Sequence, residues 1–159
     1  MLHSYHLTKK ADEQNMYFEE FVLGAKTQIE PAVIEKEDMI AFAEKYDNIP
    51  LHTDEEYAKT TFFGQLIAPG VMSFMSVWAK YLEVDLAGNE LLAGKSTRIE
   101  WHKPVFAKDV LSSTCTVSKL SKRNAKNGLV ELTFEVFNQN GELVLTDTTE
   151  MIVKCKPES

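Results

Sequence analysis

Apolar residues recur with helical spacing over one segment of the chain, from Val71 to Leu82. Within it they fall at i, i+3, i+4, i+7, i+8 and i+11, and the opposite side is largely apolar too. A helix that is apolar nearly all round is expected to be surrounded by other elements. We therefore predict a central helix here, with Phe74, Met75 and Trp78, beside Val71, facing the core.

Other segments have the composition or the alternation of strands. Polar and apolar residues alternate over residues 130–136, and Thr, Ser and Val are abundant in an earlier segment. We predict strands at residues 26–34, 91–101, 110–120, 130–136 and 143–153. Pro31 cannot donate to a ladder, so it weakens the first strand or places it at a sheet edge. Asn140-Gly141 predicts a hairpin turn before the last strand, and residues 121–128 are expected to form a polar loop.

Two further helices are expected before the apolar one. Residues 35–46 have helical spacing, with acidic residues in the first turn that suit the helix dipole. That helix must end before Pro50, because the residue preceding a proline is pushed out of the α region. Thr53 and Glu56 have the spacing of a capping box and predict a short helix to about Thr60. The order of elements predicts an α+β fold, in which an antiparallel sheet of about five strands wraps around the central helix.

The composition is that of a folded domain. Of the 159 residues, 44% are hydrophobic, which is enough for a core. We expect one domain over residues 16–159 and an N-terminal extension over residues 1–15, with His3 and His6 in a mobile terminus. The formal net charge of −7 argues against a broad surface for nucleic acid or anionic membranes.

The chain begins without the apolar segment of a signal peptide, and its longest helix candidate is too short to cross a bilayer. Cys115 and Cys155 lack metal-binding spacing, and we expect reduced thiols in or beside strands. These features predict a soluble, cytoplasmic protein.

An acid and an imidazole lie five residues apart, at Asp47 and His52. Pro50 between them stiffens the backbone, so local chain geometry holds the two side chains close together. Further along, Pro69-Gly70 opens the apolar helix, and Gly70 keeps a backbone N–H that proline lacks. Such a donor at the positive end of a helix suits a developing oxyanion.

These residues resemble one family's pattern. The stretch Asp47-x-x-Pro50-x-His52-x-Asp54, followed by Phe63-Gly64-x-x-Ile67-Ala68-x-Gly70, resembles the signature of the MaoC-like family of (R)-specific enoyl-CoA hydratases and dehydratases. The later Trp101-His102-Lys103-Pro104-Val105-Phe106-x-x-Asp109 resembles that family's strand-to-turn segment. The resemblance covers about residues 17–153 and implies the hot-dog fold.

The resemblance implies hydration of a trans-2-enoyl thioester, or the reverse dehydration, with acyl-CoA or an acyl-carrier-protein thioester as substrate. The matching Asp47 and His52 hold the water, and Gly70 offers its amide to the thioester oxygen. Neither a cofactor nor a metal is implied. The expected substrate-binding residues are Phe63, Gly64, Ile67, Ala68, Pro69, Val71 and Trp78.

Other functions remain open. A hot-dog thioesterase commonly needs a carboxylate on or near the central helix, and residues 66–82 contain no Asp or Glu. Ile49 and Trp78, which depart from the family's pattern, keep open a non-enzymatic acyl-thioester-binding protein or a subunit of a larger complex. Because a curled sheet leaves its helix partly uncovered, we also expect a homodimer or a higher even oligomer.

Several charged residues have simpler explanations. We expect Asp54 to be structural, as charge in the first turn of a helix, and His102 to serve packing or lie on the surface. A cluster of basic residues could meet coenzyme A phosphates, although a solvated hairpin loop is the simpler interpretation. The cluster comprises Lys119, Lys122, Arg123 and Lys126.

Overall fold

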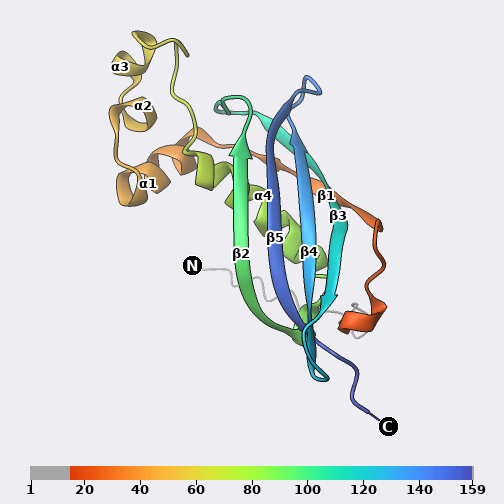
Figure 1. The fold of residues 1–159 in the computed structure, drawn as a ribbon. Helices are drawn as coiled ribbons and strands as arrows, with labels where there is room; N and C mark the ends of the chain where they lie inside the picture. The colour runs from red at the N-terminus through yellow and green to blue at the C-terminus, as the bar shows by residue number, and fades with distance from the viewer. Residues whose placement is uncertain (1–14, 159) are drawn as a thin grey trace, which may run out of the picture.

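The computed structural model describes residues 15–158, so His3, His6 and the expected extension, apart from Asn15, lie outside the described residues. The strands are Lys26–Val33 (β1), Leu91–Trp101 (β2), Val110–Lys122 (β3), Asn127–Phe137 (β4) and Leu143–Lys154 (β5). They form one antiparallel sheet in the order β1-β3-β4-β5-β2 (Figure 1). The predicted sheet of about five strands is confirmed.

The predicted polar loop over residues 121–128 is wrong in extent. β3 and β4 continue until Lys122 pairs with Gly128, and the turn is confined to residues 123–126. Ladder hydrogen bonds satisfy the backbone of these polar residues and so extend the strands. The predicted hairpin between β4 and β5 is confirmed, and Gly141 in its turn has a φ of 73°, which glycine adopts without strain.

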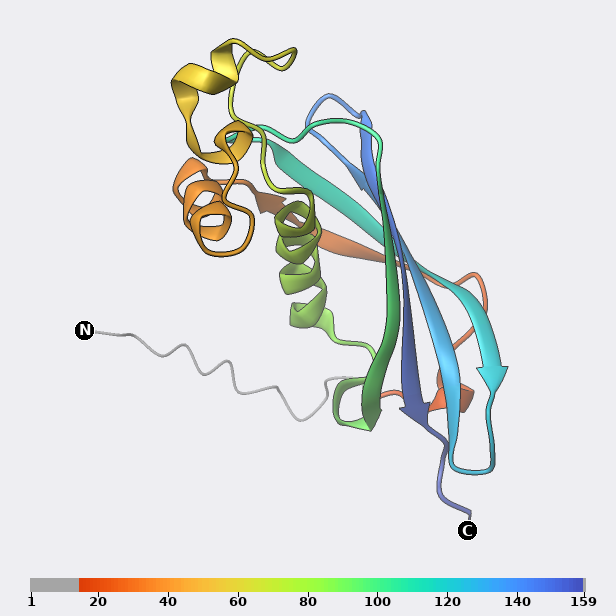
Figure 2. The same ribbon diagram turned by 60° about the vertical axis from the view of Figure 1, so that its left-hand side comes forward.

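The helical segments are Phe18–Glu20 (η1), Lys36–Tyr46 (α1), Pro50–Thr53 (α2), Glu55–Lys59 (α3), Gly70–Val84 (α4) and Gly88–Glu90 (η2). Figure 2 shows α4 against the concave face of the curved sheet, with α1, α2 and α3 grouped near its N-terminal end. Within residues 15–158, no helix is long and apolar enough to cross a membrane. The arrangement confirms the predicted α+β class.

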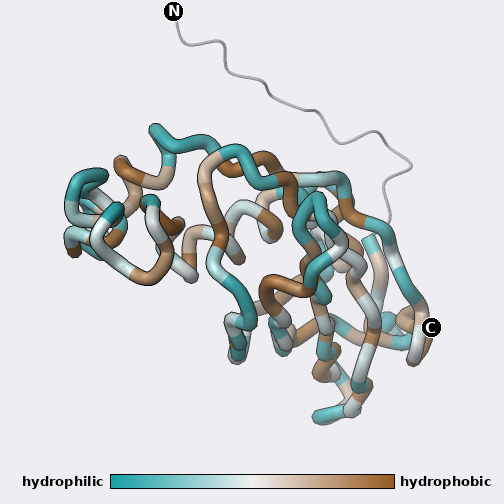
Figure 3. Tube along the Cα trace, turned by 90° about the horizontal axis from the view of Figure 1, so that it is seen from above, coloured by the Kyte–Doolittle hydropathy of each residue, from teal (hydrophilic) through white to brown (hydrophobic). Residues whose placement is uncertain are grey.

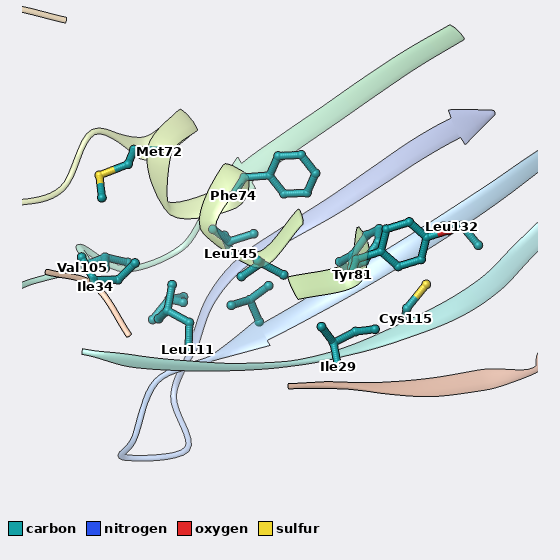
Figure 4. Packing of buried hydrophobic residues seen from close by; sticks show 14 of the residues in the cluster. Ile29, Ile34, Met72, Phe74, Tyr81, Val105, Leu111, Cys115, Leu132 and Leu145 are labelled. Carbon is teal, nitrogen blue, oxygen red and sulfur yellow. The ribbon is translucent and has the colours of Figure 1, made fainter. Parts of the chain in front are cut away.

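The core lies between α4 and the concave face of the sheet (Figure 4). Inward residues of the strands, such as Leu111, Leu132 and Leu145, are fully buried there, and the ring of Tyr81 on α4 packs edge-on against Phe134. Buried and less buried residues alternate over most of β4 and β5, because successive side chains point to opposite faces. Figure 3 shows that hydrophobic and hydrophilic residues are interspersed along the chain. Burial of these large apolar side chains holds α4 over the sheet.

The side of α4 that faces the core was predicted only in part. Phe74 is buried, but Val71 and Met75 are 48% and 45% exposed. Trp78 is half-buried and packs against Phe134. The buried residues of the helix are Met72, Ser73, Phe74, Val77 and Tyr81. Because the helix is apolar on opposite sides, its spacing does not decide which side the sheet covers.

Both edges of the sheet are recognisable by their residues. β1 is an edge strand, as Pro31 predicts, and its register with β3 shifts between Ile29 and Ala32 to accommodate a residue that cannot donate. β2 forms the opposite edge and is exposed along most of its length.

The predicted capping box at Thr53 is wrong. Thr53 ends α2, and its hydroxyl donates to the Ile49 carbonyl. The cap of α3 is Asp54, whose carboxylate accepts the N–H of Tyr57 at 3.1 Å. Pro50 explains the difference, because its fixed φ favours the first position of a helix and so starts a helical turn before Thr53. The structural role expected for Asp54 is confirmed.

Candidate active site

Asp47 and His52 are brought together by two consecutive helices. Asp47 is the C-cap of α1, where its N–H donates to the Ala43 carbonyl, and His52 lies in α2. Pro50, the first residue of α2, sets the turn between them. Asp47 Oδ2 lies 3.3 Å from His52 Nε2, and the imidazole is buried while the carboxylate is partly exposed. The expected proximity of acid and imidazole is therefore confirmed.

The hydrogen-bond partner of His52 Nδ1 determines the tautomer of the neutral ring. Nδ1 lies 2.8 Å from the carbonyl oxygen of Ile67, which can only accept, so Nδ1 carries the hydrogen. In the neutral ring, Nε2 then presents a lone pair toward Asp47 Oδ2, and two acceptors face the same space. A water molecule beside both can donate one O–H to each, so the pair is suited to hold and deprotonate one water.

The segment that accepts this hydrogen bond also leads into α4. Ile67 forms an isolated β-bridge with Phe106, and the Ala68 N–H donates to the Val105 carbonyl at 2.7 Å. Two residues later the helix begins at Gly70. This short pairing therefore fixes the start of α4 relative to the acid–imidazole pair.

The N-terminal end of α4 offers backbone N–H donors. Its N-cap, Pro69, makes no side-chain capping hydrogen bond, so N–H groups of the first turn remain available to a ligand. A Cβ on Gly70 would lie 2.4 Å from the indole of Trp101, so glycine is the residue that fits beneath this ring. These N–H groups and the helix dipole stabilise negative charge on an oxygen placed there.

One cavity of about 490 Å³ brings these groups together, a size typical of small-molecule sites. Its walls are formed by Asp47, His52, Phe63, Ile67, Ala68, Gly70, Val71, Ser73, Trp101, His102, Lys103, Pro104 and Val105. The walls thus include seven of the predicted site residues and exclude Gly64, Pro69 and Trp78. Gly64 lies in a turn with a φ of 70°, and Pro69 immediately precedes α4.

Reasoning from the sequence did not identify the cavity wall made by the end of β2 and the loop after it. His102, expected to serve packing or surface, lines the cavity, and its Nε2 lies 3.0 Å from Thr146 Oγ1. Lys103 forms an ion pair with Glu142, and this contact lowers the pKa of the Glu142 carboxyl. The sequence contained one signal for this wall, the segment beginning at Trp101, which resembles a family motif. Spacing along the chain does not indicate that this segment lies beside Asp47 and His52.

The remaining candidates lie elsewhere. Trp78 lines a separate cavity further along α4. The basic cluster lies at the far end of the sheet, since Asn127 pairs with the end of β5 whereas Trp101 pairs near its start (Figure 1). This position supports a solvated hairpin. Within residues 15–158, no group of three or more His, Cys, Asp or Glu side chains could hold a metal ion.

Comparison with known families places this cavity in context. A family model described as FAS1-like, dehydratase domain region matches residues 22–147, which is most of the chain. The chain belongs to this MaoC-like dehydratase family. The matched range contains Asp47, His52, Gly70 and the whole wall that β2 contributes.

Solved structures similar to this MaoC-like chain confirm the hot-dog fold. The monoamine oxidase regulatory protein from Archaeoglobus fulgidus is 31% identical, with a TM-score of 0.85 over 91% of this chain and 97% of that one. A MaoC-like dehydratase from Rhodospirillum rubrum is 26% identical, with a TM-score of 0.81 over 90% of this chain and 99% of that one. An R-hydratase from Pseudomonas aeruginosa is 27% identical, with a TM-score of 0.72 over 90% of this chain and 88% of that one.

Proposed function

We propose that this protein hydrates a trans-2-enoyl thioester to the (R)-3-hydroxyacyl thioester, or catalyses the reverse dehydration. One observation carries the proposal: the Asp47–His52 pair and the start of α4 at Gly70 line the same cavity. One part of the cavity offers two acceptors for a water, and another offers donors for an oxygen. Similarity to a MaoC-like dehydratase and to an R-hydratase supports this reaction class.

The hydration uses the two parts of the cavity together. The water held by Asp47 Oδ2 and His52 Nε2 adds its oxygen to C3, and its proton passes to this pair. The electron pair of the C2–C3 double bond moves toward the thioester oxygen, where the Gly70 N–H and the helix dipole stabilise the enolate. The pair then returns a proton to C2. One water is added in total, and both side chains end in their starting states.

The other lining residues would position the thioester. Phe63, Ile67, Ala68 and Val71 provide apolar surface beside the reacting groups. Gly64 and Pro69 act indirectly, by shaping the turn and the helix start. We propose acyl-CoA as the substrate, with an acyl-carrier-protein thioester as the alternative, and residues 16–159 as one catalytic domain.

We further propose a homodimer, or a higher even oligomer, formed through the β2 edge and the adjoining side of α4. β2 is an edge strand whose residues are mostly exposed. Val71, Met75 and Leu82 are 48%, 45% and 47% exposed and lie along α4 at helical spacing. A second copy would pair the open edge and cover these apolar side chains.

The two free cysteines, both buried, suit a reducing compartment, and we assign the protein to the cytoplasm. Cys115 lies within β3 and Cys155 follows β5 directly, as the sequence predicts.

The assignment is tested with crotonyl-CoA and longer enoyl-CoAs. We expect the absorbance of the conjugated thioester to decrease without release of free thiol. Thiol release would instead identify a thioesterase, and tight binding with neither change would identify a binding protein. Either result would overturn the proposed hydratase activity.

A further inference from the structure

One acid lies on the otherwise largely apolar inner face of the sheet. Asp147 of β5 is fully buried, opposite Phe134 on β4 and Ile99 on β2. Thr97 Oγ1 is within hydrogen-bond distance of Asp147 Oδ1, and Thr149 Oγ1 lies 2.6 Å from Oδ2. The two hydroxyl oxygens lie 2.9 Å from each other. The three side chains therefore form a closed ring of polar contacts, here called the Asp147 ring.

The number of hydrogens determines what this ring offers to a ligand. The hydroxyls of Thr97 and Thr149 both donate to the Asp147 carboxyl, so their hydrogens are used within the ring. Burial raises the pKa of this carboxyl, and the two hydroxyl hydrogen bonds act against that rise. The hydroxyl oxygens keep free lone pairs and present acceptors to their surroundings.

The Asp147 ring closes one side of a second cavity, of about 350 Å³. Thr97 and Thr149 lie in its wall, together with Phe74, Met75, Trp78, Gly94, Lys95 and Ser96. This cavity follows the first along the same two elements, because α4 and β2 contribute residues to both. From Gly70 to Trp78 the helix rises about 12 Å. A chain held by its carbonyl at the start of α4 would pass along this side of the helix.

We propose that the second cavity binds the acyl tail of the thioester and favours a tail that carries a hydroxyl group. The inference rests on the proposed function. Phe74 and Trp78 contact the methylene groups, and the hydroxyl donates to Thr97 or Thr149. An unsubstituted tail would cover the ring oxygens and leave them without a donor. The Asp147 ring thus determines specificity, whereas the Asp47–His52 pair performs the chemistry.

The test measures binding of saturated acyl-CoAs by calorimetry, using a series of tail lengths with and without a terminal hydroxyl. At the matching length we expect the hydroxylated tail to bind about tenfold more tightly. Thr97→Val, on the exposed edge strand, should remove this preference, and Thr149→Val should do the same. Thr148→Val is the matched control, because neighbouring strand residues point to opposite faces.

Three results would overturn the inference. One is equal affinity for both tails at every length, and another is a preference that survives both Thr97→Val and Thr149→Val. The third is a loss of affinity in Thr97→Val that is equally large for coenzyme A without an acyl group, since the donor would then be an amide of its pantetheine arm. Saturated tails cannot be hydrated, so their affinities are measured independently of turnover, and failure of the hydratase assignment would appear separately with crotonyl-CoA.

Discussion

At the scale of single residues, hydrogen positions decide what the buried polar side chains can do. The Ile67 carbonyl forces the hydrogen of His52 onto Nδ1 and leaves Nε2 as an acceptor facing Asp47. In the Asp147 ring, both threonine hydroxyls donate to the buried carboxyl. Two carboxyl groups of one chain thereby have different surroundings: Asp47 faces His52 at the cavity, and Asp147 accepts hydrogen bonds in the core.

Asp147→Asn tests the raised pKa of this carboxyl. The amide can donate to Thr97 and accept from Thr149, so we expect the variant to fold. Burial raises the native pKa of Asp147 above its value in the unfolded chain. Between these two values the native state holds more protons, so the wild-type free energy of unfolding falls as pH rises, and the variant lacks this decrease. Urea denaturation over a pH series should show the variant gaining stability relative to wild type through this range.

Two other titratable groups in this part of the core should not disturb that comparison. Burial raises the pKa of Cys115 to about 12 and also raises that of Tyr81, so both remain neutral over the range in question. Parallel stability curves for wild type and Asp147→Asn would contradict a native carboxyl that stays protonated above its ordinary pKa.

At the scale of elements, the sequence predicts what is local and misses what depends on tertiary contacts. The proximity of Asp47 and His52 follows from Pro50 and the end of α1, and all of this information lies within six residues. The wall that includes Trp101 depends on how β2 pairs with β5 and how its indole packs over Gly70. No spacing within the chain encodes that approach, so this wall emerged only from the fold.

The start of α3 shows the same limit on a smaller scale, and it can be measured. Asp54→Ala removes the carboxylate that accepts the Tyr57 N–H, so we expect the free energy of unfolding to fall by about 1 kcal/mol. Thr53→Ala removes only an exposed hydrogen bond to the Ile49 carbonyl and should cost clearly less. Urea denaturation of both variants makes the comparison. A larger loss of unfolding free energy in Thr53→Ala than in Asp54→Ala would contradict Asp54 as the cap and favour the capping box predicted from the sequence.

At the scale of the whole molecule, α4 is apolar on two sides, and the sheet of its own chain covers one of them. The sheet of its own chain buries Phe74, Val77 and Tyr81, which the structure shows directly. On the opposite side, Val71, Met75 and Leu82 are exposed, and we propose that a second copy covers them. The helical spacing of the sequence predicted a surrounded helix. It did not indicate which apolar residues of α4 the sheet of the same chain would bury and which would stay exposed.

Light scattering tests this assembly. We expect about twice the chain mass of 18.0 kDa for the wild type, or a higher even multiple. Leu82→Glu places a charge on the exposed side of α4 and should shift the protein toward monomer. Leu23→Glu is the matched control, because Leu23 is 63% exposed in the segment before β1. A wild-type monomer at micromolar concentration would rule out the proposed dimer.

The most direct test of the proposed chemistry compares three variants in the hydration of crotonyl-CoA. Asp47→Asn and His52→Ala remove the carboxylate and the imidazole that we propose to hold and deprotonate the water, and each should lower kcat by about a hundredfold or more. Asp54→Asn is the matched control, since Asp54 lies in the same motif but caps α3, a role that asparagine also fills. We predict near wild-type turnover for Asp54→Asn. Undiminished turnover in Asp47→Asn and His52→Ala would contradict the assignment of this pair as the water-activating site.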